Sequence, residues 1–138
     1  MGALFLARFL PVGSFRSIDV GSGPGFPGIP VAIYRPDCQV TLIESHQRKA
    51  VFLREAIRGL SNVTVVAGRA EDVKQEFDWV ISRAVDPDEV LGLRLAPRFA
   101  LLIGDSDASR LAGAAEPLPW GEHRVLFHVE RSQTNSAT

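Results

Sequence analysis

Cysteine is almost absent from this chain, which contains a single one, Cys38. One cysteine cannot form an internal disulfide, and such scarcity is typical of proteins that fold in a reducing compartment. The chain also lacks an apolar run of the roughly 18 residues that a membrane-spanning helix needs. Its start, MGALFLARFLPVGSF, has no basic segment before the apolar residues, and Arg8 interrupts them. We therefore expect a cytoplasmic protein with no signal peptide and no membrane partner.

An excess of charge of either sign is missing as well. The 15 basic and 16 acidic residues nearly balance, so the total neither indicates nor excludes a nucleic-acid partner. The three histidines, at positions 46, 123 and 128, do not have the spacing of metal ligands, and we expect no metal site. A chain of 138 residues has the usual size of one domain, so a single domain over 1–138 is predicted.

Apolar runs and amphipathic segments alternate along the chain. Strands are predicted where apolar and β-branched residues cluster, at Ser17–Val20, Gln39–Glu44, Asn62–Gly68, Phe77–Ser82, Phe99–Ile103 and Arg124–Glu130. Helices are predicted at Leu4–Leu10, Pro27–Tyr34, His46–Leu60, from Asp86 onward, and at Asp107–Ala115. This order predicts an α/β fold: a mostly parallel sheet with helices on both faces and an antiparallel last strand.

The stretch SIDVGSGPGFPGIPVAI joins the first of these strands to a helix and is rich in glycine. Glycine allows a ligand to approach the backbone with no Cβ between them, and ligands of α/β sheets bind at this end of the strands. The motif GPGFPG matches the dinucleotide pattern GxGxxG. The motif DVGSGPG matches the pattern of S-adenosylmethionine-dependent methyltransferases equally well. It contributes Asp19, Gly21, Gly23 and Gly25.

Neither the glycine loop nor the acid that follows it decides between the two cofactors. Glu44 ends the second predicted strand, where both cofactors use a carboxylate for the ribose hydroxyls. Pro27 and Pro30 remove two N–H donors from the start of the helix, which weakens the case for a phosphate site. At this point both cofactors remain possible ligands of the loop, and a purely structural role of the loop is a third hypothesis.

The third and fourth strands favour the methyltransferase. The third strand is followed by GRAED, in which Glu71 can accept a hydrogen bond from an adenine amino group beside the small Ala70. A nicotinamide-dependent enzyme has no need of that acid. The fourth strand is introduced by Phe77 and Asp78, a frequent methyltransferase feature, and ends in SRA, which places Arg83 at the reactive end of the cofactor site.

Together these stretches resemble one family, the bacterial small-subunit ribosomal RNA guanine-N7 methyltransferases known as RsmG or GidB. The matching segments are IDVGSGPGFPGIPVAI, VTLIES, RKAVFL, NVTVVAGRAED and FDWVISRAV. The resemblance implies a Rossmann-like class I methyltransferase fold, S-adenosylmethionine as cofactor and ribosomal RNA of the small subunit as partner. It also implies a cofactor site made of Asp19, Gly21, Gly23, Gly25, Phe26, Glu44, Ala70, Glu71 and Arg83. Arg83 is its candidate catalytic residue.

The chain departs from the family pattern at three places. Residues 1–14 are expected to be a remnant of a longer N-terminal helical segment, and the family's longer tail is shortened here, with its last two strands compressed into AEPLPWGEHRVLFHVER. Residues 132–138 are expected to be a disordered tail. The fifth strand ends in Ile103-Gly104, where the family has Lys-Gly. These departures leave two alternatives open: a shortened relative that methylates another substrate, and a non-catalytic protein that binds S-adenosylmethionine.

The sequence holds no obvious acid–base pair, and the implied chemistry does not need one. Guanine N7 carries an exposed lone pair, so no proton has to leave before the attack on the methyl group. The helix predicted at His46–Leu60 also carries four basic residues, at 48, 49, 54 and 58. These side chains suit an RNA-facing strip, but a solvated face of an amphipathic helix is the interpretation that the sequence favours.

Overall fold

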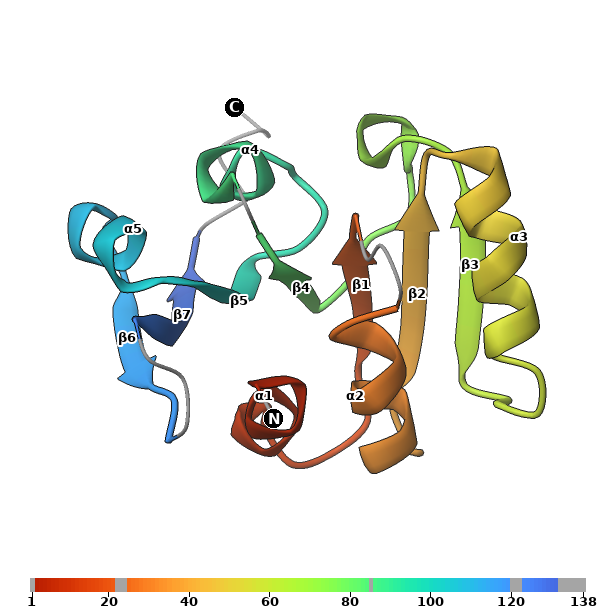
Figure 1. The fold of residues 1–138 in the computed structure, drawn as a ribbon, viewed down its shortest axis with the longest axis horizontal. Coiled ribbons are helices and arrows are strands. Elements are labelled where there is room, and N and C mark those ends of the chain that lie inside the picture. Colours follow the sequence, from red (N-terminus) through yellow and green to blue (C-terminus); the bar gives the residue numbers. More distant parts are fainter. Residues whose placement is uncertain (1, 22–24, 85, 120–122, 132–138) are drawn as a thin grey trace.

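The computed structural model describes residues 2–21, 25–84, 86–119 and 123–131. Within them a seven-stranded sheet has the order β3-β2-β1-β4-β5-β7-β6 (Figure 1). The strands are β1 (Arg16–Val20), β2 (Gln39–Glu44), β3 (Val63–Ala67), β4 (Trp79–Arg83), β5 (Arg98–Gly104), β6 (Ala114–Pro117) and β7 (Arg124–Glu130). The first five are parallel, and β7 runs antiparallel to both β5 and β6. The predicted α/β fold with an antiparallel last strand is confirmed.

Helices cover both faces of this sheet. One face carries α1 (Gly2–Phe9), α2 (Gly28–Tyr34) and α3 (Gln47–Ala56), while the other carries the 3-10 turn η1 (Ala70–Asp72), α4 (Pro87–Leu91) and α5 (Asp105–Arg110). Successive side chains of a strand point to opposite faces. In β4, accordingly, Ile81 packs with the first group and Val80 with the second. No helix in the described ranges is long and apolar enough to cross a membrane.

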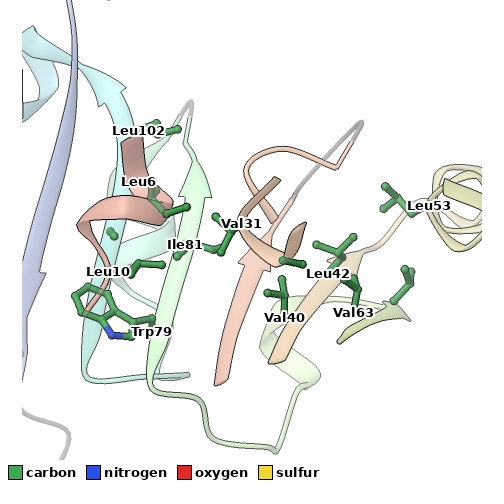
Figure 2. Close-up of a cluster of buried hydrophobic side chains, with 14 of the residues drawn as sticks. Leu6, Leu10, Val31, Val40, Leu42, Leu53, Val63, Trp79, Ile81 and Leu102 are labelled. Carbon is green, nitrogen blue, oxygen red and sulfur yellow. The ribbon is translucent and has the colours of Figure 1, made fainter. Parts of the chain in front are cut away.

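The buried apolar side chains beneath α1, α2 and α3 hold these three helices against the sheet. Figure 2 shows Leu6 of α1 and Val31 of α2 close to Ile81 of β4. Leu42 and Leu53, which tie β2 to α3, are fully buried. Burying one such leucine contributes roughly 1.5–3 kcal/mol, so this contact helps to hold α3 against the sheet.

A single arginine joins α1 to the end of α2. The Arg35 guanidinium donates hydrogen bonds to the carbonyl oxygens of Ala7 and Leu10, both at 3.1 Å, and to Pro11 at 2.6 Å and Gly13 at 3.2 Å. The carbonyls at the end of α1 have no partner within their own helix. Arg35 supplies those partners and thereby holds the segment that leads into β1.

The last third of the chain differs from the sequence prediction. The helix expected at Asp107–Ala115 begins earlier and ends at Arg110, because Ala114 and Ala115 pair with β7 as part of β6. Strand β6 is exposed along its whole length and includes a proline, so it has no alternation of apolar and polar residues that would reveal it. The predicted strand at Arg124–Glu130 is confirmed with the same bounds.

Candidate cofactor site

A pocket of about 280 Å³ opens at the carboxyl ends of β1, β2 and β3. Four of the residues predicted for the cofactor site line it: Gly21, Glu44, Ala70 and Glu71. They come from three strand ends that parallel pairing brings to one edge, where Val20 lies beside Ile43 and Glu44 beside Ala67. The other lining residues are Val20, Ile43, Ser45, Gly68, Arg69, Glu89, Val90 and Leu93.

Gly21 needs glycine for its backbone conformation. Its φ angle is +66°, in the left-handed region that L side chains rarely adopt. Its N–H donates to the Ile43 carbonyl oxygen at 3.3 Å, which holds the start of the loop against β2. A Cβ at this position would meet open space rather than another atom, so the backbone itself forms the pocket wall here.

Asp19 lies fully buried beneath the start of α2. Its Oδ2 accepts a hydrogen bond from the Gly28 N–H at 2.7 Å, and its Oδ1 has no hydrogen-bond partner among the described residues. Burial raises the pKa of the Asp19 carboxyl well above its usual range, against the opposing effects of the Gly28 hydrogen bond and the Arg83 charge. A Cβ on Gly28 would overlap the Leu42 side chain and lie 2.8 Å from Asp19 Oδ2. Glycine at 28 therefore allows this close approach.

The first turn of α2 has no N–H left for a phosphate group. Gly28 donates to Asp19, Ile29 donates to the Gly25 carbonyl oxygen at 2.8 Å, and Val31 donates to the Pro27 carbonyl oxygen at 3.1 Å. Pro30 has no N–H. A phosphate at a helix N-terminus is held by free N–H groups, so this turn does not provide the pyrophosphate contact of a dinucleotide-binding fold.

The pocket is acidic instead. Glu44 is 8% exposed, and its Oε2 accepts the His46 N–H at 2.9 Å, which fixes the carboxylate at the rim. Glu71 and Glu89 add two further carboxylates, against one cation, Arg69, whose Nε lies 3.8 Å from Glu71. Such a set of hydrogen-bond acceptors attracts hydroxyl, amino and cationic groups and repels phosphate.

The wall formed by α4 and the segment after it was not predictable from the sequence. Glu89, Val90 and Leu93 line the pocket opposite the turn that follows β3. Figure 1 shows α4 and that turn at the same edge of the sheet, where β1 ends. The sequence contained one signal for this helix, the capping residue Asp86, whose carboxylate accepts the Glu89 N–H at 3.4 Å. It did not show which residues of the helix would face the pocket.

Of the remaining predicted site residues, those that the structure describes do not line the pocket. Arg83 is exposed at the end of β4, close enough to Asp19 for its charge to act on that carboxyl. Gly25 is buried, and Phe26 is 47% exposed. Gly23 lies outside the described residues. Among the described residues, no group of three or more histidine, cysteine, aspartate or glutamate side chains has the arrangement of a metal site.

Comparison with solved structures identifies the fold. The chain matches a ribosomal protein L11 methylase from Lactobacillus delbrueckii subsp. bulgaricus with a TM-score of 0.73 and 13% identity, over 94% of this chain and 77% of that one. It also matches M. capricolum TrmK in complex with S-adenosyl-homocysteine, with a TM-score of 0.72 and 10% identity, over 96% and 68% of the two chains. At such identities the likeness shows a class I methyltransferase fold and no more.

Comparison of sequences identifies the family. A ribosomal RNA small subunit methyltransferase G from Nitrosomonas europaea is 58% identical over 71 residues, which are 49% of this chain and 33% of that protein. The Kineococcus radiotolerans protein of the same name is 41% identical over 129 residues, 86% of this chain and 50% of that one. The chain thus spans half or less of the length of these relatives. The family model described as rRNA small subunit methyltransferase G matches residues 3–95, and the chain belongs to this GidB family.

Proposed function

We propose that this chain binds S-adenosylmethionine in the pocket at the ends of β1, β2 and β3, and transfers its methyl group to N7 of a guanine in small-subunit ribosomal RNA. The observation that carries the proposal is the acidic pocket beside a helix whose first turn has no free N–H group. S-adenosylmethionine has a cationic sulfonium and an ammonium group, and it has no phosphate. A ribosomal substrate would place the protein in the cytoplasm.

The pocket residues fit each part of this cofactor. Glu44 would accept hydrogen bonds from the ribose hydroxyls, since a carboxylate at the end of the second strand has this role in related folds. Glu71 would accept from the adenine amino group, and Val90 and Leu93 supply an apolar wall for the ring. The methionyl part would lie along the glycine loop near Asp19, whose unpartnered Oδ1 can accept a hydrogen bond.

The proposed chemistry asks little of the protein beyond orientation. S-adenosylmethionine, when bound, would supply a methyl group on its sulfonium. The guanine N7 lone pair would form the new N–C bond as the S–C bond breaks, with S-adenosylhomocysteine as the leaving group. Because no proton leaves N7, no general base is needed. Alignment of the two reactants is worth up to roughly 7–11 kcal/mol. Arg83, exposed at the end of β4 and near Asp19, would hold the cofactor carboxylate and so orient the sulfonium.

Two measurements test the proposal. Calorimetric titration should show binding of S-adenosylhomocysteine and none of NAD, and NAD binding alone would overturn the cofactor assignment. Labelled S-adenosylmethionine should then transfer its methyl group to small ribosomal subunits from cells that lack this modification. If the cofactor binds but no label enters the RNA, the chain is a binding protein or has another acceptor.

Replacing Glu44 with glutamine should weaken binding of S-adenosylhomocysteine about tenfold, because a hydrogen bond to a charged group contributes about 1.5–3 kcal/mol and glutamine keeps only a neutral acceptor. Calorimetry measures this change. The matched control is Glu55→Gln on α3, which removes the same charge from an exposed carboxylate that pairs with Arg58. The control should bind like the unmodified chain, and an equal loss in both variants would count against the role of Glu44.

A further inference from the structure

Helix α3 carries an exposed aromatic residue among basic side chains, close to the pocket. Phe52 is 60% exposed, an unusual state for so large an apolar side chain. Arg48 and Lys49 are also exposed and lie four and three residues before it. Residues at these spacings share one side of a helix. We call the surface formed by Arg48, Lys49 and Phe52 the α3 flank.

A second exposed aromatic residue belongs to the neighbouring loop. Gly25 packs against α3, since a Cβ built on it would lie 3.4 Å from the Leu53 Cδ2 atom. Phe26 directly follows Gly25 and is 47% exposed, just as Phe52 directly precedes Leu53. Two exposed phenyl rings thus belong to segments that touch one another. The glycine loop and α3 also both adjoin the pocket, which Gly21 and Ser45 line.

We propose that the α3 flank, together with Phe26, is a docking surface for single-stranded RNA. The proposal rests on the proposed function and names the surface that receives its acceptor. Unpaired bases stack on aromatic side chains, and phosphates are neutralised by arginine and lysine. The α3 flank offers both groups side by side. The pocket itself is lined by three carboxylates and repels phosphate, so RNA needs a separate basic surface next to it.

The arrangement also explains why the RNA would be single-stranded. In a duplex the base faces are already stacked on one another, and recognition then depends on phosphate and 2′-hydroxyl contacts. Exposed phenyl rings contribute nothing to such contacts. The sequence alone favoured a solvated face for the basic residues of this helix, and the exposure of Phe52 and Phe26 is the structural observation that changes the interpretation.

Three variants test the surface with a fluorescein-labelled single-stranded RNA of mixed sequence, read by anisotropy. Phe52→Ala should weaken binding about tenfold, the loss expected for one stacked base. The double variant Arg48→Gln/Lys49→Gln should weaken it and lower the slope of log affinity against log salt by about 1.4, or about 0.7 per phosphate. The control is Arg54→Gln/Arg58→Gln, which makes the same charge change away from the α3 flank and should stay within about twofold. Arg54 lies around the opposite side of the helix, and Arg58 lies in the turn that follows it.

Calorimetry with S-adenosylhomocysteine separates this proposal from the proposed function, because none of the three variants should alter cofactor affinity. If the Arg54→Gln/Arg58→Gln control loses as much RNA affinity as Arg48→Gln/Lys49→Gln, the attraction is nonspecific and the proposed docking surface is wrong. The proposal is also wrong if all variants bind RNA like the unmodified chain, or if the chain binds duplex RNA more tightly than single-stranded RNA. Sedimentation is the last check: a dimer that Phe52→Ala dissociates would assign the surface to a second copy of the chain instead.

Discussion

Substitution of Asn62 with aspartate is expected to lower the free energy of unfolding by about 3 kcal/mol at pH 7. The buried Asn62 amide donates hydrogen bonds to three carbonyl oxygens, those of Ala32 at 3.0 Å, Arg35 at 3.3 Å and Cys38 at 2.9 Å. Aspartate has the same shape but presents a carboxylate to these acceptors. Breaking a buried polar network in this way costs several hydrogen bonds and leaves a buried charge unpaired. Urea denaturation measures the change.

The pH dependence of stability distinguishes repulsion between the new carboxylate and the three carbonyl oxygens from simple loss of the Asn62 amide donor. In the Asn62→Asp variant, three carbonyl oxygens surround the introduced carboxyl and disfavour its charged form. The pKa of this carboxyl is therefore higher in the folded state than in the unfolded state. The folded variant therefore retains its proton to higher pH than the unfolded one, and its stability falls as pH rises through this range. Asn62→Ala is the matched control: it loses the same hydrogen bonds, should cost about 2 kcal/mol, and should show no added pH dependence. Equal losses for the two variants at every pH would contradict the argument.

Asn62 illustrates what the sequence could not reveal. The three carbonyls belong to residues 24 to 30 positions earlier in the chain, and they become neighbours only after β2 and β3 have paired. The same holds for Arg35, whose four acceptors lie in the last turn of α1 and in the connection from α1 to β1. Sequence patterns report local periodicity, and these contacts depend on the assembled sheet.

The pocket was predictable to the extent that it depends on strand ends. Gly21, Glu44, Ala70 and Glu71 each follow or end a predicted strand, and parallel pairing places such positions at one edge. The wall from Glu89 to Leu93 could not be placed in the same way. It depends on where a short helix ends and turns back over the edge, which neither its cap nor its length determines.

Replacing Asp19 with asparagine is expected to stabilise the protein at pH 7 and to weaken binding of S-adenosylmethionine about a hundredfold. The first effect follows from burial, because the neutral amide oxygen can still accept the Gly28 N–H while the cost of a buried charge disappears. The second follows from the proposed site. A buried carboxylate that faces a cationic ligand contributes about 2–5 kcal/mol to binding. Thermal unfolding and calorimetry measure the two effects separately.

The stabilisation should depend on pH with a defined sign. Because burial raises the pKa of Asp19 in the folded state, the folded protein binds more protons than the unfolded chain just above the ordinary aspartate pKa of 3.8. The free energy of unfolding of the unmodified chain, compared with that of Asp19→Asn, is therefore highest below that pH. The unmodified chain then becomes less stable than the variant by a growing amount as pH rises through the raised pKa. A difference between the two proteins that does not change with pH would contradict a buried, titrating carboxyl.

Ser17→Ala provides the matched control for Asp19→Asn. Ser17 lies two residues earlier on the same face of β1, is fully buried, and its Oγ also has no hydrogen-bond partner among the described residues. Removing that hydroxyl should not weaken cofactor binding, because the serine carries no charge toward the glycine loop. If both variants bind S-adenosylmethionine like the unmodified chain, Asp19 serves only to anchor Gly28. If only Asp19→Asn loses affinity while gaining stability, the chain retains a destabilising charge because the cofactor requires it.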